Sequence, residues 1–518
     1  MKSKTLVFLL FLTITLAAAN GFAAANVELT WDFENGSLGG WRTAESNNII
    51  LSHAPGSGGL WYYFQLDGIL NKTLTFVFEQ ARDDYFGGDN LPVLSYDRQN
   101  WAFIKNRIIL DIPGDESKVR YSFTHSFAQN RAWIAFAPPF SNADRDRLEK
   151  EISSHPHVQI QTLCESPIKK LKIPIVFVTD PQSPAEEKKC VLLLCREDAY
   201  ETASSWIARG AIEYLLSDDP AAAAIKRRTI FMIFPIFDVD GVAMGRAVHP
   251  MIHGGDGVFW TETWPETSYS FYEQRQMKRF LQDWKNQGRT IDYSLRLHSC
   301  SWNENLFRRE YASESNYAEQ DALFIETFEK KYLPWYRNPE RILQDTRFSR
   351  FVGDLFPNAL AGFGMSEYVY PPSFARNFLL YKSCDDLFIE GELIVRAIGE
   401  RLGVPASDPP PYLHSAEFYE LSRVQKRVFH ARCLYRDLLG RPPEYVRVIV
   451  NEKPIDLEAM KGQELDYNRG VLFEGNITVD AAVNSHYFLA SNSYKICRIP
   501  NEGSRPGPFI LDFDKREK

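Results

Sequence analysis

The chain is most informative at residues 191–202, which run Val191-Leu192-Leu193-Leu194-Cys195-Arg196-Glu197-Asp198-Ala199-Tyr200-Glu201-Thr202. The apolar run at the start predicts a short buried strand, and the apolar spacing of the following residues 207–216 predicts a helix. Between them lies a loop with two carboxylates three residues apart, Asp198 and Glu201. A strand that ends in such a loop is a place where a metal could bind. Carboxylates at the end of the strand offer oxygen ligands for a metal.

Length and composition limit the possible classes of protein. The 518-residue length predicts two to four domains. Hydrophobic residues make up 44% of the chain and aromatic residues 14%, so large cores can be buried and global disorder is excluded. The net charge is −8, and no basic run or basic aromatic patch stands out. We therefore expect no nucleic-acid partner.

The first 25 residues have the pattern of a signal peptide. Lys2 and Lys4 precede the apolar run 6–17, and Ala23-Ala24-Ala25 offers a cleavage site before Asn26. The apolar run is too short for a membrane-spanning helix, and no other segment is long and apolar enough to span a membrane. We therefore expect a secreted or periplasmic protein with no integral membrane segment after signal cleavage.

The rest of the chain divides into three parts by pattern. Residues 26–157 contain short alternating or apolar runs between Gly, Asp and Asn, which predicts a β-sandwich domain. In residues 158–403 strand-like runs alternate with helical ones, which predicts an α/β domain around a mixed sheet. Residues 404–518 begin with a Pro-rich linker. A helix near Ala416–Leu439 and a small β-rich C-terminal domain are predicted after that linker.

Cysteine usage leaves the redox state open. An odd count in an exported chain leaves at least one thiol without an intramolecular partner. Cys195 and Cys300 each end a predicted core strand, so a disulfide and two buried thiols are both open for this pair. Free buried cysteines are the preferred interpretation for most of the set. The seven positions, with no CxxC pair among them, are Cys164, Cys190, Cys195, Cys300, Cys384, Cys433 and Cys497.

The loop 195–202 also resembles a metal-ligand loop of the zinc carboxypeptidases, with Asp198-x-x-Glu201 in place of that family's His-x-x-Glu. Residues 292–301 resemble the family's strand that ends in Asp-Leu-His-Gly-His, and His298 falls on the metal-binding His. The resemblance therefore implies zinc held by Asp198, Glu201 and His298. This set carries one more negative charge than the family's set, which would weaken the metal as a Lewis acid and favour a harder divalent ion.

Each of these three residues also has an ordinary structural interpretation. Asp198 fits a loop or N-cap residue, Glu201 fits a solvated first-turn carboxylate, and His298 fits a strand-end histidine with a backbone partner. Their order along the chain, and the core strands that precede them, favour a shared polar site.

Further motifs extend the resemblance over about residues 28–400. Pro235–Val242 resembles the family's Pro-x-x-Asn-Pro-Asp-Gly-Val, with Asp and Val in place of Asn and Pro. Trp31–Gly36 resembles the opening of the sandwich domain in the cytosolic-carboxypeptidase branch. The expected fold is α/β, with a carboxypeptidase-like mixed sheet that has helices on both faces. A β-sandwich domain precedes this sheet and a small β-rich tail domain follows it.

The resemblance also implies catalytic and substrate-binding residues. Glu367 matches the family's general base, and its ordinary alternative is a strand-end carboxylate paired with an Arg. Arg246 is a counterpart, about two positions out of register, of the Arg that stabilises the oxyanion. Thr261 and Glu262 stand where the family's Asn-Arg pair binds the terminal carboxylate of the substrate. Glu262 would repel that carboxylate, so we expect poor trimming of free-acid peptides and better binding of amidated or basic-ended ones.

Two main classes of function follow. One is an exported metallopeptidase that acts on a peptide or protein substrate with altered ligands and specificity. The other is a catalytically inactive relative that binds peptide or glycan in the same cleft, and a purely structural surface protein is a third possibility. Stoichiometric zinc binding separates the first two classes.

Overall fold

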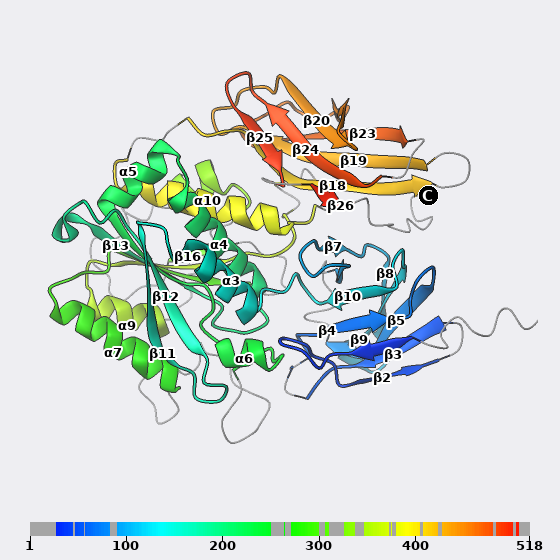
Figure 1. Ribbon diagram of the computed structural model, residues 1–518, viewed down its shortest axis with the longest axis horizontal. Coiled ribbons are helices and arrows are strands. Elements are labelled where there is room, and N and C mark those ends of the chain that lie inside the picture. The colour runs from blue at the N-terminus through cyan, green and yellow to red at the C-terminus, as the bar shows by residue number, and fades with distance from the viewer. Residues whose placement is uncertain are drawn as a thin grey trace, which may run out of the picture.

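The structure is a computed structural model that describes residues 27–44, 47–55, 57, 59–82, 91–249, 264, 271–299, 306–309, 326–336, 347–371, 374, 380–404, 408–422, 427–479, 483–500 and 504–506. An N-terminal pair of sheets, a central sheet with helices and a C-terminal pair of sheets follow one another along the chain (Figure 1). This arrangement confirms the predicted fold class.

The N-terminal region consists of two five-stranded sheets that share an aromatic core. Phe64 and Phe76, one from each sheet, are fully buried, and their ring centroids lie 5.9 Å apart. One sheet has the order β1 (Glu28–Thr30), β4 (Tyr63–Asp67), β10 (Arg131–Ala135), β6 (Val93–Ser95) and β7 (Ala102–Phe103). The other has the order β2 (Gly40–Thr43), β3 (Asn48–Ser52), β5 (Thr73–Arg82), β9 (Asp115–Ser126) and β8 (Arg107–Ile112).

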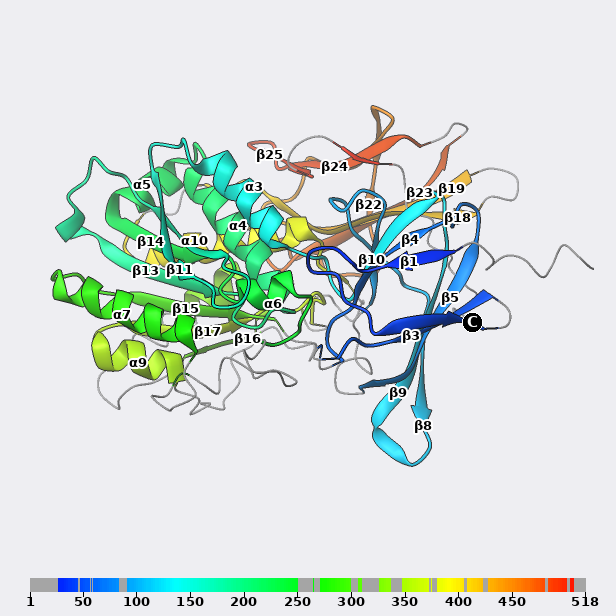
Figure 2. The same ribbon diagram turned by 60° about the horizontal axis from the view of Figure 1, so that its bottom comes forward.

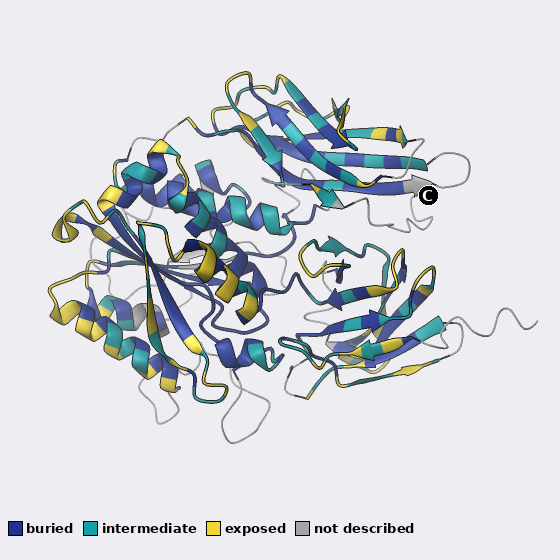
Figure 3. Ribbon diagram, viewed as in Figure 1, coloured by how far each residue is buried: buried dark blue, intermediate teal, exposed yellow. Residues whose placement is uncertain are grey.

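The central sheet has seven strands, and its middle strands β14, β13, β15 and β17 are parallel. Every residue of β14 and β15 is buried (Figure 3). Strands that are buried along their whole length are typical of a sheet that is covered on both faces. In spatial order the strands are β11 (Val158–Glu165), β12 (Lys172–Val178), β14 (Thr229–Phe234), β13 (Lys189–Cys195), β15 (Tyr293–His298), β17 (Leu360–Met365) and β16 (Leu306–Arg309).

Helices cover both faces of this sheet, with α4, α5 and α10 on one face and α7 and α9 on the other (Figure 2). Helices α4 and α10 approach so closely that only glycine fits at two contact positions. A Cβ on Gly210 would lie 2.3 Å from the carbonyl oxygen of Phe388, and a Cβ on Gly391 would lie 2.2 Å from the carbonyl oxygen of Ile207. This contact fixes the helix that follows the carboxylate loop. The described α-helices are α3 (Asn142–Ile152), α4 (Thr202–Leu216), α5 (Pro220–Arg228), α6 (Val239–Ala243), α7 (Tyr272–Asn286), α9 (Arg347–Leu355) and α10 (Cys384–Arg401), with a short 3₁₀ turn η2 (Ala185–Glu187) and a π-helix η4 (Glu326–Tyr332).

The C-terminal region is built from two sheets, and the helix predicted near Ala416–Leu439 is wrong. Those residues form most of the antiparallel pair β18 (Tyr412–Ser422) and β19 (Arg427–Arg436). Alternate residues of β19, such as Phe429 and Ala431, face a core shared with the second sheet, and this period of two is that of a strand. The other strands are β20 (Tyr445–Val450), β21 (Lys453–Asp456), β22 (Glu458–Ala459), β23 (Val471–Val479), β24 (Ser485–Ser491), β25 (Ile496–Ile499) and β26 (Arg505–Pro506).

Six of the seven cysteines lie in the described ranges, and all six are free thiols. Cys300 and the N-terminal residues 1–25 lie outside those ranges. None of the helices described here combines the length and the apolar character that a membrane crossing requires. The predicted boundaries after residues 157 and 403 stay predictions.

Candidate active site

The loop between β13 and α4 carries Asp198 and Glu201, and a buried arginine holds its shape. Arg196 has a backbone φ of +59°, and its guanidinium donates to the carbonyl oxygens of Ala199 (2.7 Å) and Phe140 (3.2 Å). Glu201 is the N-cap residue of α4, yet its side chain makes no capping hydrogen bond. Asp198 is 3% exposed and Glu201 4% exposed. Neither residue is therefore a solvated surface carboxylate.

The segment that follows β14 holds the same loop in place through backbone hydrogen bonds. The backbone N–H of Phe237 donates to the carbonyl of Cys195 (3.1 Å), and that of Asp238 donates to the carbonyl of Arg196 (3.0 Å). The Asp238 carboxylate accepts from the N–H of Gly241 at 2.9 Å, where a Cβ would lie 2.3 Å from that same carboxylate. The Asp-x-Asp-Gly sequence therefore lets the chain turn directly beneath the carboxylate loop.

His298, the last residue of β15, meets the two carboxylates. Because β13 and β15 are parallel neighbours, their carboxyl ends lie at the same edge of the sheet. One potential ligand atom from each of Asp198, Glu201 and His298 lies within 4.8 Å of the other two. Nδ1 of His298 is 2.7 Å from Oε2 of Glu201 and 3.8 Å from Oδ2 of Asp198. The structure thus brings the three predicted ligands together.

Glu197 was not among the predicted site residues, yet it holds the other side of the imidazole. Its Oε2 accepts from Nε2 of His298 (3.0 Å) and from Nε of Arg296 (2.7 Å), and its Oε1 accepts from the indole N–H of Trp264 (2.7 Å). All four side chains are buried. A metal-binding histidine commonly donates its second N–H to a carboxylate in this way. The available signal was Arg296, a charged residue in an apolar strand, two positions before His298 and so on the same face.

The electrostatics of the site favour a cation. Burial raises the pKa of Glu197, but Arg296 and His298 outweigh it and lower that pKa to about 2. Burial lowers the pKa of His298, but the Glu201 carboxylate and the hydrogen bond to Glu197 raise it to about 10. At that pKa the imidazole is protonated when no metal is bound, and its protonated Nδ1 lies 2.7 Å from Oε2 of Glu201. The carboxylates therefore require a positive charge at this position, and a metal cation that replaces the Nδ1 proton fits these residues.

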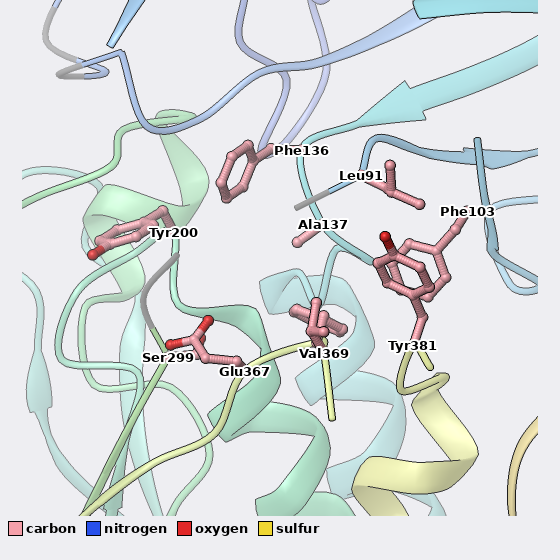
Figure 4. A pocket seen from close by; sticks show the side chains of 10 residues that line it. Leu91, Phe103, Phe136, Ala137, Tyr200, Ser299, Glu367, Val369 and Tyr381 are labelled. Carbon is pink, nitrogen blue, oxygen red and sulfur yellow. The ribbon is translucent and has the colours of Figure 1, made fainter. Parts of the chain in front are cut away.

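Glu367 follows β17 at the same edge of the sheet. Ser366, just before it, donates its backbone N–H to the carbonyl of His298 (2.9 Å). The hydroxyl of Tyr368, just after it, lies 2.6 Å from the hydroxyl of Thr202 at the start of α4. Glu367 is 2% exposed. It lines a pocket together with Tyr200 and Ser299, which are neighbours in sequence of two predicted ligands (Figure 4). Glu367 thus lies at the same edge of the sheet as the three predicted ligands.

Of the other predicted site residues, the structure describes only Arg246. Arg246 is partly buried, and its guanidinium donates to the backbone carbonyl of Pro55 in the N-terminal region. Thr261 and Glu262 lie outside the described residues. The predicted roles of these three residues in oxyanion stabilisation and substrate binding stay predictions.

Two family models match the chain in the order of its domains. Residues 29–137 match the model described as cytosolic carboxypeptidase N-terminal domain, and residues 148–318 match the model described as zinc carboxypeptidase. The chain belongs to the zinc carboxypeptidase family. The resemblance stated from the sequence is thereby confirmed, and the family is one of metal-dependent peptide hydrolases. Glu367 lies beyond the second matched range, so its assignment depends on its position in the fold.

The curated relatives are cytosolic carboxypeptidases. Cytosolic carboxypeptidase 2 of Danio rerio is 24% identical over 213 residues, which cover 36% of this chain and 29% of the relative. Cytosolic carboxypeptidase 6 of Caenorhabditis elegans is 23% identical over 326 residues, which cover 60% and 69%. The match spans only 20% to 29% of the length of the first three relatives. A metallo-carboxypeptidase structure from Burkholderia cenocepacia shares the fold, with a TM-score of 0.59, 16% identity and coverage of 73% of this chain and 99% of that one.

These relatives correct one prediction. Their names place them in the cytosol, which contradicts the predicted secreted or periplasmic localisation. That prediction is wrong, because it depended on the composition of residues 1–25 alone. Two lysines before a short apolar run are a compositional pattern, and the relatives outweigh it.

Proposed function

We propose that this zinc carboxypeptidase family member hydrolyses peptide bonds with a divalent metal held by Asp198, Glu201 and His298. The observation that carries the proposal is the convergence of three buried ligand atoms within 4.8 Å of one another. Two buried carboxylates side by side are unfavourable unless a cation compensates them. Three protein ligands leave a position open at zinc, and the bound metal supplies Lewis acidity toward the peptide carbonyl.

The ligand set of this chain is more negative than the family's set of two histidines and one glutamate. Asp198 supplies an oxygen where the family supplies an imidazole nitrogen. Oxygen ligands are better suited to harder cations than imidazole is. We therefore propose zinc as the resident ion, with a greater tolerance of manganese than a site with two histidines would show.

Glu367 is proposed as the general base. The attacking water transfers a proton to the Glu367 carboxylate while its oxygen forms a bond to the carbonyl carbon. Glu367 then passes that proton to the amide nitrogen as the C–N bond breaks, which releases a carboxylic acid and an amine. Burial of Glu367 at 2% exposure excludes bulk water from this exchange.

Turnover by the zinc-loaded wild type and by Glu367→Gln tests this function. Matched free-acid and amidated peptides are the substrates, so the proposed repulsion by Glu262 is tested in the same assay. We expect the variant to keep its zinc and to lose about 10²–10⁴-fold in rate, because Gln cannot accept the proton. A fully active Gln variant would remove Glu367 from the mechanism. Stoichiometric zinc without turnover on any peptide would favour the catalytically inactive relative that binds peptide or glycan.

A further inference from the structure

The pocket beside Glu367 is formed jointly by the central domain and the N-terminal region. Its described lining residues come from both: Leu91, Phe103, Phe136 and Ala137 on one side, and Tyr200, Ser299, Glu367, Tyr368, Val369 and Tyr381 on the other. Figure 4 shows Phe136 above the Glu367 carboxylate and Leu91, Phe103 and Tyr381 to one side. We propose that this pocket is a substrate subsite for a small uncharged side chain, and that Phe136 sets its size. The proposal rests on the proposed peptidase function.

The wall of the pocket away from Glu367 is apolar and closely packed (Figure 4). Leu91, Val369 and Tyr381 are buried and form a small cluster of their own, against which Phe103 packs. The rings of Phe103 and Tyr381 have centroids 4.9 Å apart. Two of these residues come from the N-terminal region and two from the central domain, so the substrate-facing wall exists only when both are present.

The free volume of the pocket restricts what can enter. It amounts to about 20 Å³, which is room for about one water molecule. A methyl group is similar in size, whereas a Leu or Phe side chain would force the wall to move. Overfilling a packed apolar site by a few methylenes typically costs about 1–3 kcal/mol.

Charge restricts the occupant further. Glu367 is the one acidic or basic side chain among the described lining residues. An acidic substrate side chain would meet Glu367 at close range in a site with little water, which is repulsive. A lysine or arginine side chain would be attracted to Glu367 but is far larger than the available space. A small neutral side chain, such as that of Ala or Ser, remains.

Phe136 is the residue of this wall that can be changed with the least disturbance. It is only partly buried, and its ring meets that of Tyr62 edge-on with centroids 6.0 Å apart. Phe103 and Tyr381, in contrast, also line a neighbouring cleft of about 430 Å³, where Phe136 is not among the described lining residues. Truncating either of those two would therefore alter both spaces, whereas truncating Phe136 enlarges the Glu367 pocket alone.

The test compares wild type with Phe136→Ala on peptides that differ only in the two residues flanking the scissile bond, with Ala, Leu, Phe or Glu at each position. For the wild type we expect Ala to be preferred over Phe at one of the two positions. In Phe136→Ala, kcat/KM for the Phe and Leu peptides should rise relative to Ala by about tenfold or more, since pocket size typically discriminates by about 10–200-fold. Ala137→Val, which narrows the same space, should shift the ratio the other way. Zinc content and thermal melting of each variant confirm that the site is intact.

A binding measurement separates this inference from the proposed function. Zinc-loaded Glu367→Gln and the double variant Glu367→Gln/Phe136→Ala are titrated with the same peptides by calorimetry. Tighter binding of the Ala peptides that disappears in the double variant supports the subsite, whether or not the wild type turns over. Equal binding of Ala and Phe peptides by Glu367→Gln, or an unchanged ratio in the double variant, would overturn it. Absence of turnover by the wild type would count against the peptidase function alone.

Discussion

Two buried histidines of the central domain lie against carboxylates, and they differ in what those carboxylates contact. At His298, Glu197 holds Nε2 while Asp198 and Glu201 face Nδ1. At His249, Nδ1 lies 2.9 Å from Oδ1 of Asp238, and Nε2 lies 3.8 Å from Oε1 of Glu273. In composition the two clusters are alike, since each joins one imidazole to several acidic groups.

The second cluster uses part of its oxygens to hold the neighbouring chain. Oδ1 of Asp238 also accepts from the N–H of Gly241 (2.9 Å). Asp240, in the same turn, accepts from the hydroxyl of Ser166 (2.6 Å) and from the N–H of Lys169 (2.9 Å). Only the first cluster, among the residues that the structure describes, brings three ligand atoms together. Burial of a histidine among carboxylates is therefore not sufficient for a metal site, because the oxygens must also converge.

Replacing each histidine in turn gives the largest expected effect. His298→Ala should lower zinc affinity by more than about 100-fold, because even an outer-shell partner of a metal ligand is typically worth about 10–100-fold. His249→Ala should leave zinc stoichiometry and affinity unchanged. Competition against a chromophoric chelator measures both variants. An equal loss of zinc affinity in the two variants would show that the two clusters do not differ in metal binding.

The His249 cluster should be visible instead in the pH dependence of stability. Burial raises the pKa of Glu273 from 4.5 to about 7, although His249 opposes the shift. The folded protein then keeps a proton that the unfolded chain releases, so the free energy of unfolding should fall as the pH rises from 4.5 to 7. The fall attributable to Glu273 is at most about 3 kcal/mol. The pKa of His249 is also raised, because burial is outweighed by Asp238, and it adds a further fall in the same direction above pH 6.5.

Glu273→Gln removes the titrating carboxylate and should flatten this dependence. Urea unfolding of both proteins at pH 5, 6, 7 and 8, at equal zinc loading, provides the comparison. The variant should gain stability relative to wild type as the pH rises. Parallel curves across this range would show that Glu273 titrates normally in the folded protein.

How well the sequence predicted each feature depends on how far apart along the chain the interacting residues lie. The strand before Asp198 was predictable because a strand buried on both faces is continuously apolar. The pair β18 and β19 was not, because alternation in a half-buried hairpin competes with a helical spacing in the same residues. Glu197 was missed because its partners, Trp264 and Arg296, lie 67 and 99 residues away along the chain. Only the folded sheet edge brings them to His298.

Glu197→Gln tests the His298 cluster further, and its expected effect on zinc affinity is smaller than that of His298→Ala. A Gln side chain has one acceptor oxygen and one NH₂ group, so it cannot accept from Arg296, His298 and Trp264 together. The Nε2–H tautomer of His298 is then less favoured, and a proton on Nδ1 competes with the metal. We expect zinc affinity to fall by about 10–100-fold. Chelator competition at several pH values should show that this deficit does not shrink as the pH rises, because the balance between the two neutral tautomers is independent of pH and the loss of Glu197 lowers the pKa of His298.

A matched control separates this effect from a general loss of stability. Glu417 is also a carboxylate with two cationic partners, Lys105 and Arg432, each 2.7 Å from its Oε2, but it lies between the N-terminal and C-terminal regions. Glu417→Gln disrupts a partly buried ion-pair network, so it should lower the stability of the fold. It should leave zinc affinity unchanged. If both variants lose affinity in proportion to their loss of stability, Glu197 supports the fold rather than the orientation of His298.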